Sequence, residues 1–145
     1  MNTRQAIEEI IKLARERTAI NRRTERRIER DDKGQLRPIN GELGRIFKDR
    51  QRDEARRRIQ DFMMSLPEKE ARKIVALMYW GRDNGHPDIQ VVHNQFDSQH
   101  TDILVMMACD KLPLADYLIA AVRLAEASGL DIEGDFDSEV EGGEK

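Results

Sequence analysis

The sequence predicts an all-α protein, a compact helical bundle of five or six helices with a charged N-terminal helical arm or hairpin and a disordered acidic C-terminal tail. Arg, Glu, Ala and Leu are abundant and runs of β-branched residues are few, which is a helix-forming composition. Apolar residues recur at helical spacing between breaks that contain Gly and Pro. A chain of 145 residues is long enough to bury one core.

The net charge of -3 hides an uneven distribution. Residues 1–60 carry 18 basic and 11 acidic side chains, residues 61–130 carry 6 and 10, and residues 131–145 carry 1 and 7. Together with the apolar pattern, these charges predict three parts. They are a basic helical arm or hairpin over 1–58 with a Gly/Pro linker near 31–44, a helical core domain over 59–130, and an acidic disordered tail over 131–145.

Two helices are expected in the basic part. The first begins near Asn2 or Thr3 and has an apolar stripe that fades after Arg15. The stripe consists of Ala6, Ile10, Leu13 and Ala14, with Ile7 and Ile11 beside it. The second helix runs from about Glu42 or Leu43 to Met64. Only its second half should dock firmly, through Ala55, Ile59, Phe62, Met63 and Leu66.

The third helix carries the only Trp of the chain at its end, within A-L-M-Y-W-G-R-D-N-G. Ser65 and Glu68 match the S-x-x-E capping box that would begin it. Ala71, Ile74, Val75 and Met78 are expected to face inward, Trp80 to be buried, and Gly81 to end the helix in a left-handed conformation.

Further helices follow after His86-Pro87. Asp88 is a candidate N-cap for a short helix that extends to Phe96. Ile103 to Cys109 is a run of seven apolar residues, which is typical of a helix buried on all sides. It is expected either at the centre of the bundle or at the seam of a homodimer. The last helix spans Leu114 to Ser128, buries Tyr117, Leu118, Ala121, Val122 and Ala125, and ends at Gly129.

Two segments together carry a resemblance to a known family. A-L-M-Y-W-G-R-D-N-G, which starts at Ala76, and L-P-L-A-D-Y-L, which spans Leu112 to Leu118, resemble motifs of a small bacterial family, domain of unknown function 3775. The resemblance covers about residues 59–130. It implies a related fold and no particular activity. The turn Asp83-Asn84 replaces a shorter Arg-Gly turn of the family, and the basic N-terminal part differs from the family's acidic linker.

The turn after Trp80 is the first candidate site. Arg82, Asp83 and Asn84, with the aromatic pair Tyr79 and Trp80, are candidates for binding an anion or a partner. A helix stop followed by an Asn-Gly turn explains the same residues without a ligand.

The second candidate is a metal site formed by His93, Asp97 and His100. Their i, i+4, i+7 spacing places them on one face of a continuous helix, and two imidazoles with a carboxylate can ligate iron or zinc. A helix break near Ser98 would separate them, and a solvated polar face is the alternative interpretation.

The third candidate is a nucleic-acid surface, since arginine suits phosphate. Its residues are Arg22, Arg23, Arg26, Arg27, Arg30, Arg56 and Arg57. Acidic residues interleave with them, which is equally typical of a self-paired solvated helix.

No catalytic set emerges from these patterns, and no cofactor is predicted. Cys109 lies in the most apolar segment and is expected to be a buried, inert thiol. No apolar run is long enough for a membrane span and no signal core is evident, so a cytoplasmic location is expected. The preferred hypothesis is a non-enzymatic interaction or regulatory module with a protein partner or a second copy. The alternatives are a nucleic-acid-binding accessory protein and a metal-dependent enzyme.

Overall fold

The computed structural model describes residues 1–26, 28–30, 36–38 and 41–136, and the side chains of residues 1–22 and 50–136. Within this part the elements are α1 (Thr3–Arg26), β1 (Ile28–Arg30), β2 (Leu36–Pro38), α2 (Gly41–Met64), α3 (Glu68–Arg82), α4 (Ile89–Asn94), α5 (Thr101–Cys109) and α6 (Leu114–Ser128). The predicted all-α class is confirmed. The two short strands pair antiparallel, with Ile28 opposite Pro38, where the sequence predicts only an N-terminal helix and a linker.

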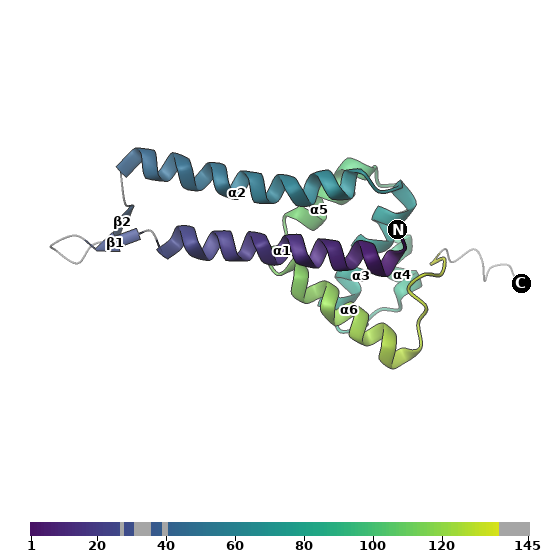
Figure 1. Cartoon of the computed structure of the whole chain (residues 1–145). Helices are drawn as coiled ribbons and strands as arrows, with labels where there is room; N and C mark the ends of the chain where they lie inside the picture. Colours follow the sequence, from purple (N-terminus) through teal and green to yellow (C-terminus); the bar gives the residue numbers. More distant parts are fainter. Residues whose placement is uncertain (27, 31–35, 39–40, 137–145) are drawn as a thin grey trace, which may run out of the picture.

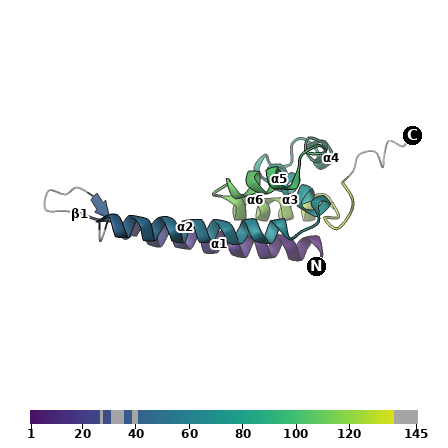
Figure 2. The same ribbon diagram turned by 90° about the horizontal axis from the view of Figure 1, so that it is seen from above.

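The helices form two layers (Figures 1 and 2). The long helices α1 and α2 lie side by side and antiparallel, with β1 and β2 at one end of the pair. Helices α3 to α6 pack against the other end, where the N-terminus lies, and leave the rest of the pair uncovered. The sequence explains why only this end of α1 is covered. Its apolar stripe is buried at Ala6, Ile7, Ile10 and Ala14 and then stops.

The core contains most of the apolar residues that the sequence assigns to it. On α2, Ala55, Ile59 and Met63 are buried, and on α3, Ala71, Ile74, Val75, Met78 and Trp80 are buried. Leu118, Ala121 and Ala125 of α6 are buried, whereas Tyr117 and Val122 are half-buried. The same apolar cluster also includes the first half of α1 and extends to Phe136, so the core extends beyond residues 59–130 at both ends.

Gly81 has a different role from the one predicted. It lies inside α3 and is buried, and the helix continues to Arg82. A Cβ atom at Gly81 would lie 2.8 Å from the backbone nitrogen of Ala121 and closer still to the carbonyl oxygen of Tyr117. The missing side chain therefore lets α3 and α6 approach backbone to backbone. The left-handed residues come later, at Asn84 and Gly85.

The predicted capping box at the start of α3 is also wrong. Pro67 occupies the N-cap position and makes no side-chain cap. The Ser65 hydroxyl donates instead to the carbonyl oxygen of Phe62, at the end of α2. The carboxylate of Glu68 accepts hydrogen bonds from Arg72 and Thr101. The two residues of the motif are therefore used by different contacts. By contrast, Gly129 ends α6 in the left-handed conformation, as predicted.

The first part of the acidic tail is docked, which contradicts the prediction of disorder from residue 131. Ile132 and Phe136 are buried in the core cluster. The Glu133 carboxylate accepts hydrogen bonds from the backbone N–H groups of Thr3 (2.8 Å) and Arg4 (3.0 Å), and so caps α1. Burial raises the pKa of Glu133, but these two hydrogen bonds, the charge of Lys73 and the Thr3 side chain together outweigh burial and hold that pKa below its usual value. Val140 and the rest of 137–145 lie outside the described residues.

Candidate partner surface

Helix α5 is not buried on all sides. Leu104, Val105, Ala108 and Cys109 face the core, but Ile103 is 38% exposed and Met106 is 48% exposed. The reason is that α5 contacts α3 and α2, which cover its inner face only. The apolar run therefore gives this helix an exposed apolar strip, and the expectation of complete burial within one chain is wrong.

The exposed strip continues onto α2. Met64, at the end of α2, is 46% exposed and lines, together with Val105 and Met106, a hollow of about 330 Å³ between the two helices. Gln60, Arg56, Asp102 and Cys109 complete its lining. We call Met64, Ile103, Met106 and the lining of this hollow the α2–α5 surface. The charged residues of its lining are Arg56 of α2, which is ion-paired with Asp110, and Asp102 of α5.

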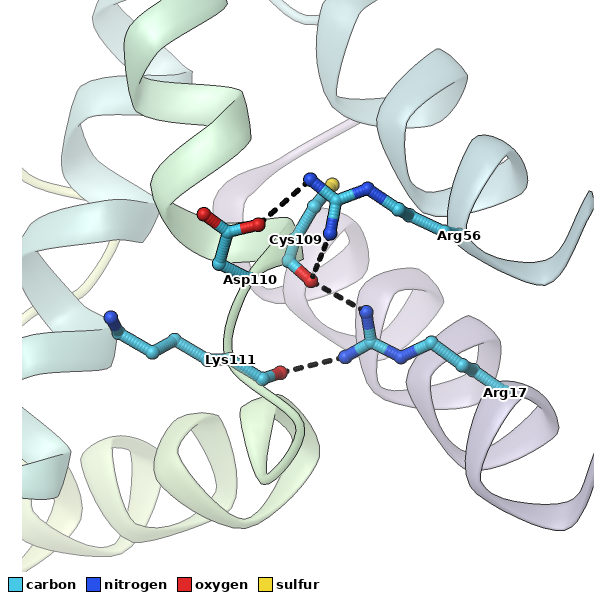
Figure 3. A network of polar contacts seen from close by, with 5 residues as sticks. All are labelled: Arg17, Arg56, Cys109, Asp110 and Lys111. Carbon is cyan, nitrogen blue, oxygen red and sulfur yellow. Dashed lines mark hydrogen bonds and ion pairs between the residues drawn. The ribbon is translucent and has the colours of Figure 1, made fainter. Parts of the chain in front are cut away.

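An arginine pair fixes the end of α5 beside this surface (Figure 3). Arg17 of α1 donates from Nη1 to the carbonyl oxygen of Cys109 at 2.7 Å and from Nη2 to that of Lys111 at 2.6 Å. Arg56 of α2 donates to the same Cys109 oxygen at 3.1 Å and to Asp110 Oδ1 at 2.8 Å. The last carbonyl groups of a helix lack hydrogen-bond partners within it, and the C-terminal end of a helix carries partial negative charge. Two arginines at this end therefore supply both hydrogen-bond donors and compensating positive charge.

The two arginines differ in burial. Arg17 is 4% exposed, and burial lowers its pKa from the usual value. Arg56 is half-buried, and its ion pair with Asp110 is open to solvent. The sequence places Arg17 in a stretch where the apolar stripe has faded, and nothing in that pattern marks it as buried. Its signal is position alone, because Ile10, Ala14 and Arg17 share one helical face.

Cys109 is a buried thiol, as predicted. Burial raises the pKa of this thiol, and the charges of Arg56 and Arg17 offset the effect only in part. A thiol that stays protonated is a poor nucleophile, so the residue acts here as an apolar group whose carbonyl oxygen receives both arginines.

The turn after α3 does not form the predicted anion site. Arg82 donates to both carboxylate oxygens of Asp83, at 2.9 Å and 3.0 Å, and its guanidinium lies 4.6 Å from the centre of the Tyr79 ring. These hydrogen bonds raise the pKa of Arg82 and lower that of Asp83. The positive charge is therefore already neutralised by its neighbour, and the geometry favours the simpler interpretation of a helix stop and turn.

Tyr79 and Trp80 have different environments although they are adjacent. Tyr79 stacks on Phe96 with ring centres 5.5 Å apart, and the Lys111 ammonium lies 5.3 Å from the centre of the Tyr79 ring. Trp80 is buried, as predicted, and together with Asn84 lines a separate pocket. The five residues of this candidate site thus do not form one surface.

The predicted metal triad is not assembled. Helix α4 ends at Asn94 and α5 begins only at Thr101, so the continuous helical face that would align the three residues does not exist. His93 is 1% exposed and packs edge-on against Phe136 at 5.8 Å, whereas Asp97 and His100 are exposed. In the part of the chain that the structure describes, no three His, Cys, Asp or Glu residues lie where they could hold a metal ion.

The arginines of the predicted nucleic-acid surface fall into three groups. Arg22 and Arg57 are exposed on the α1–α2 pair, and Arg56 is engaged at the end of α5. The side chains of Arg23, Arg26, Arg27 and Arg30 lie outside the described residues. Arg22 and Arg57 therefore stay candidates for this surface, whereas Arg56 is engaged within the chain.

Across the described residues, no helix has both the length and the apolar character needed to cross a membrane. Comparisons of the chain with protein-family models, with curated proteins and with solved structures found no match. The resemblance to domain of unknown function 3775 thus stays a prediction that rests on the two motifs around Trp80 and Tyr117.

Proposed function

We propose that this chain is a non-enzymatic helical interaction module that binds a second copy of itself through the α2–α5 surface. One observation carries this proposal. Met64 of α2 and Ile103 and Met106 of α5 expose apolar side chains beside a hollow of about 330 Å³, while the inner face of α5 is buried. Contiguous exposed apolar groups of this kind usually mark an interface.

Charge complementarity favours a second copy as the occupant. The α2 edge of the surface carries Arg56, whose ion pair with Asp110 of the same chain is open to solvent, and the α5 edge carries Asp102. Both Arg56 and Asp102 line the hollow. A two-fold axis through the hollow would set the α2 of each copy against the α5 of the other, so that each basic edge meets an acidic edge. Methionine side chains at the centre, Met64 and Met106, adapt their shape to fill such a seam.

The test is a charge placed in the apolar centre. Met106→Lys and, separately, Ile103→Lys should convert a dimer into a monomer, because each would bury an unpaired ammonium group in the seam. The measurement is sedimentation equilibrium or light-scattering mass at low micromolar concentration. Val91→Lys is the matched control, since Val91 is also an exposed apolar residue (49%) but lies on α4 and outside the surface.

Two results would contradict self-association through this surface. One is a wild-type chain that is monomeric at every concentration up to high micromolar. The other is a dimer that Met106→Lys and Ile103→Lys leave intact. Circular dichroism of each variant shows whether the helices persist, so loss of the dimer can be separated from unfolding.

Nucleic-acid binding is a second candidate, favoured by the exposed arginines of the α1–α2 pair. Those whose side chains the structure describes are Arg15, Arg22, Arg50, Arg52, Arg57 and Arg58. Exposed acidic residues such as Asp53 and Glu54 lie among them and weaken the positive electrostatic potential of this surface. Phosphate contacts would make the affinity for duplex DNA fall steeply with salt, and Arg57→Gln with Arg58→Gln would reduce that slope. Equal binding by this double variant would argue against these contacts.

A further inference from the structure

A second cavity lies at the C-terminal end of α3. It shares no lining residue with the hollow of the α2–α5 surface. It has a volume of about 620 Å³ and is bordered by the end of α3, the start of α4, the end of α6 and the segment 129–136. This volume is within the range of sites that hold a small ligand or a peptide side chain. The docked part of the tail, described above, supplies one of its walls.

The walls combine apolar groups with carboxylates. Trp80, Leu124 and Phe136 supply apolar surface. Asp88, Asp131 and Asp135 supply negative charge, and the lining residues within the described part of the chain include no Lys or Arg. Asp135 is also within 3.2 Å of the Lys69 ammonium, whereas Asp88 and Asp131 are exposed. An occupant with an apolar stem and a positive end would complement such walls, and tryptophan attracts cations at its ring face.

Trp80 adds an independent sign of a ligand. The residue is only 6% exposed, and its Nε1–H group has no acceptor among the described residues. This nitrogen lies close to Gly85, another wall residue, since a Cβ atom at Gly85 would lie 3.8 Å from it. A buried donor without an acceptor costs free energy, so an oxygen that enters beside Gly85 would be bound favourably.

We infer that this cavity binds a lysine- or arginine-containing segment of a partner protein. Such a segment offers the three features that the walls require, which are a methylene stem, a terminal cation and backbone carbonyl oxygens for the Trp80 Nε1–H group. The chain's own residues 137–145 do not fit this chemistry, because they carry four acidic residues and one Lys. Like charges would oppose their entry.

The experiment uses the single Trp of the chain as its reporter. An acetylated and amidated peptide with two Lys residues between Gly residues is titrated into the full chain. Trp80 fluorescence should change with saturation, and the single indole N–H resonance should shift downfield. The matched peptide with norleucine in place of Lys keeps the stem and removes the charge, and spermidine keeps the charge and removes the carbonyl groups. Neither should reproduce both signals.

Variants of the protein test the walls. Asp88→Asn combined with Asp131→Asn should weaken binding about tenfold, since each removes one attractive charge pair. Asn keeps the oxygen with which Asp131 accepts the backbone N–H of Glu133, so the turn is preserved. The control is Asp97→Asn with Asp116→Asn, two exposed carboxylates that line neither this cavity nor the α2–α5 hollow.

The titration is run on wild type and on Met106→Lys, so that self-association through the α2–α5 surface and peptide binding fail or succeed separately. Absence of any Trp80 signal with the Lys peptide would overturn the inference. Equal binding of the norleucine peptide, equal binding of spermidine, or an unchanged affinity of the Asp88→Asn and Asp131→Asn variant would do the same.

Discussion

Helices α3 and α6 approach so closely at Gly81 that a single Cβ atom would meet the backbone of Tyr117 and Ala121. Helices α2 and α5, in contrast, leave a hollow of about 330 Å³ between Met64 and Met106. Close packing of the first kind leaves no space to adapt, because interiors are packed as densely as organic crystals. The second contact is closed at one end by charged side chains and is lined by adaptable ones, so it can accept further atoms.

The α3–α6 contact should be the most sensitive point of the molecule. Gly81→Val would force the two backbones apart and should lower the free energy of unfolding by about 3 kcal/mol or more, the upper end of the usual cost of overpacking. Urea unfolding followed by circular dichroism measures this change. Ala127→Val, at an exposed site on α6, is the control for β-branching in a helix and should cost only a few tenths of a kcal/mol. A Gly81→Val chain with wild-type stability would show that the close approach is not required.

The position of the end of α5, beside the hollow, should depend most on Arg17 of α1. Arg17→Met keeps an apolar stem and removes the donors to the carbonyl oxygens of Cys109 and Lys111. The free energy of unfolding should fall by about 1.5–3 kcal/mol, as expected for a buried hydrogen bond to a charged group. Arg15→Met, on the exposed face of the same helix, is the matched control and should have little effect. Equal losses in the two variants would mean that burial of Arg17 is not what stabilises α5.

Arg56 should matter less although it shares an acceptor with Arg17. Its ion pair with Asp110 is exposed to solvent, so Arg56→Met should cost less than about 1 kcal/mol. Because both arginines donate to the Cys109 carbonyl oxygen, the double variant with Arg17→Met should be non-additive. Urea unfolding of the two single variants and the double variant measures this coupling. Simple additivity would show that the two contacts act independently.

The exposed centre of the α2–α5 surface should contribute least to the stability of one chain. Met106→Gln should change the free energy of unfolding by no more than about 0.5 kcal/mol when measured at a concentration where the chain is monomeric. The same substitution should still weaken self-association, because it removes apolar area from the proposed seam. A large loss of monomer stability would mean that Met106 belongs to the core and not to a binding surface.

Gly81 and Arg17 show where interpretation of the sequence failed. A glycine after an aromatic pair matches the signature of a helix stop, but it also matches a close helix contact. Only the position of α6 distinguishes the two. An arginine in a stripe that has lost its apolar residues looks solvated. It becomes buried because the end of α5, distant in sequence, lies opposite it.

The candidate sites show the same difference between local properties, which the sequence contains, and contacts between distant segments, which it does not reveal. The prediction that Trp80 is buried is confirmed, because side-chain size and hydropathy are local properties, whereas an interface at Ile103–Cys109 stays a prediction. The sequence aligned His93, Asp97 and His100 on a helix that ends too early, since a short break between α4 and α5 carries no strong signal. It also treated Ile132 and Phe136 as part of a disordered tail. The burial of Phe136 depends on Lys73 and His93, which lie against its ring and are distant from it in sequence.

The sequence by itself determined the all-α class, the approximate bounds of α2, α3 and α6, and the inward faces of α1, α2 and α3. Helical periodicity is set by each residue and its neighbours three or four positions away, and the chain contains that information locally. The tertiary structure alone decided which glycine permits a backbone contact, which arginine is buried, which methionines stay exposed and where the segment 131–136 docks. Each of these depends on what lies opposite the residue in space, and no local pattern specifies that.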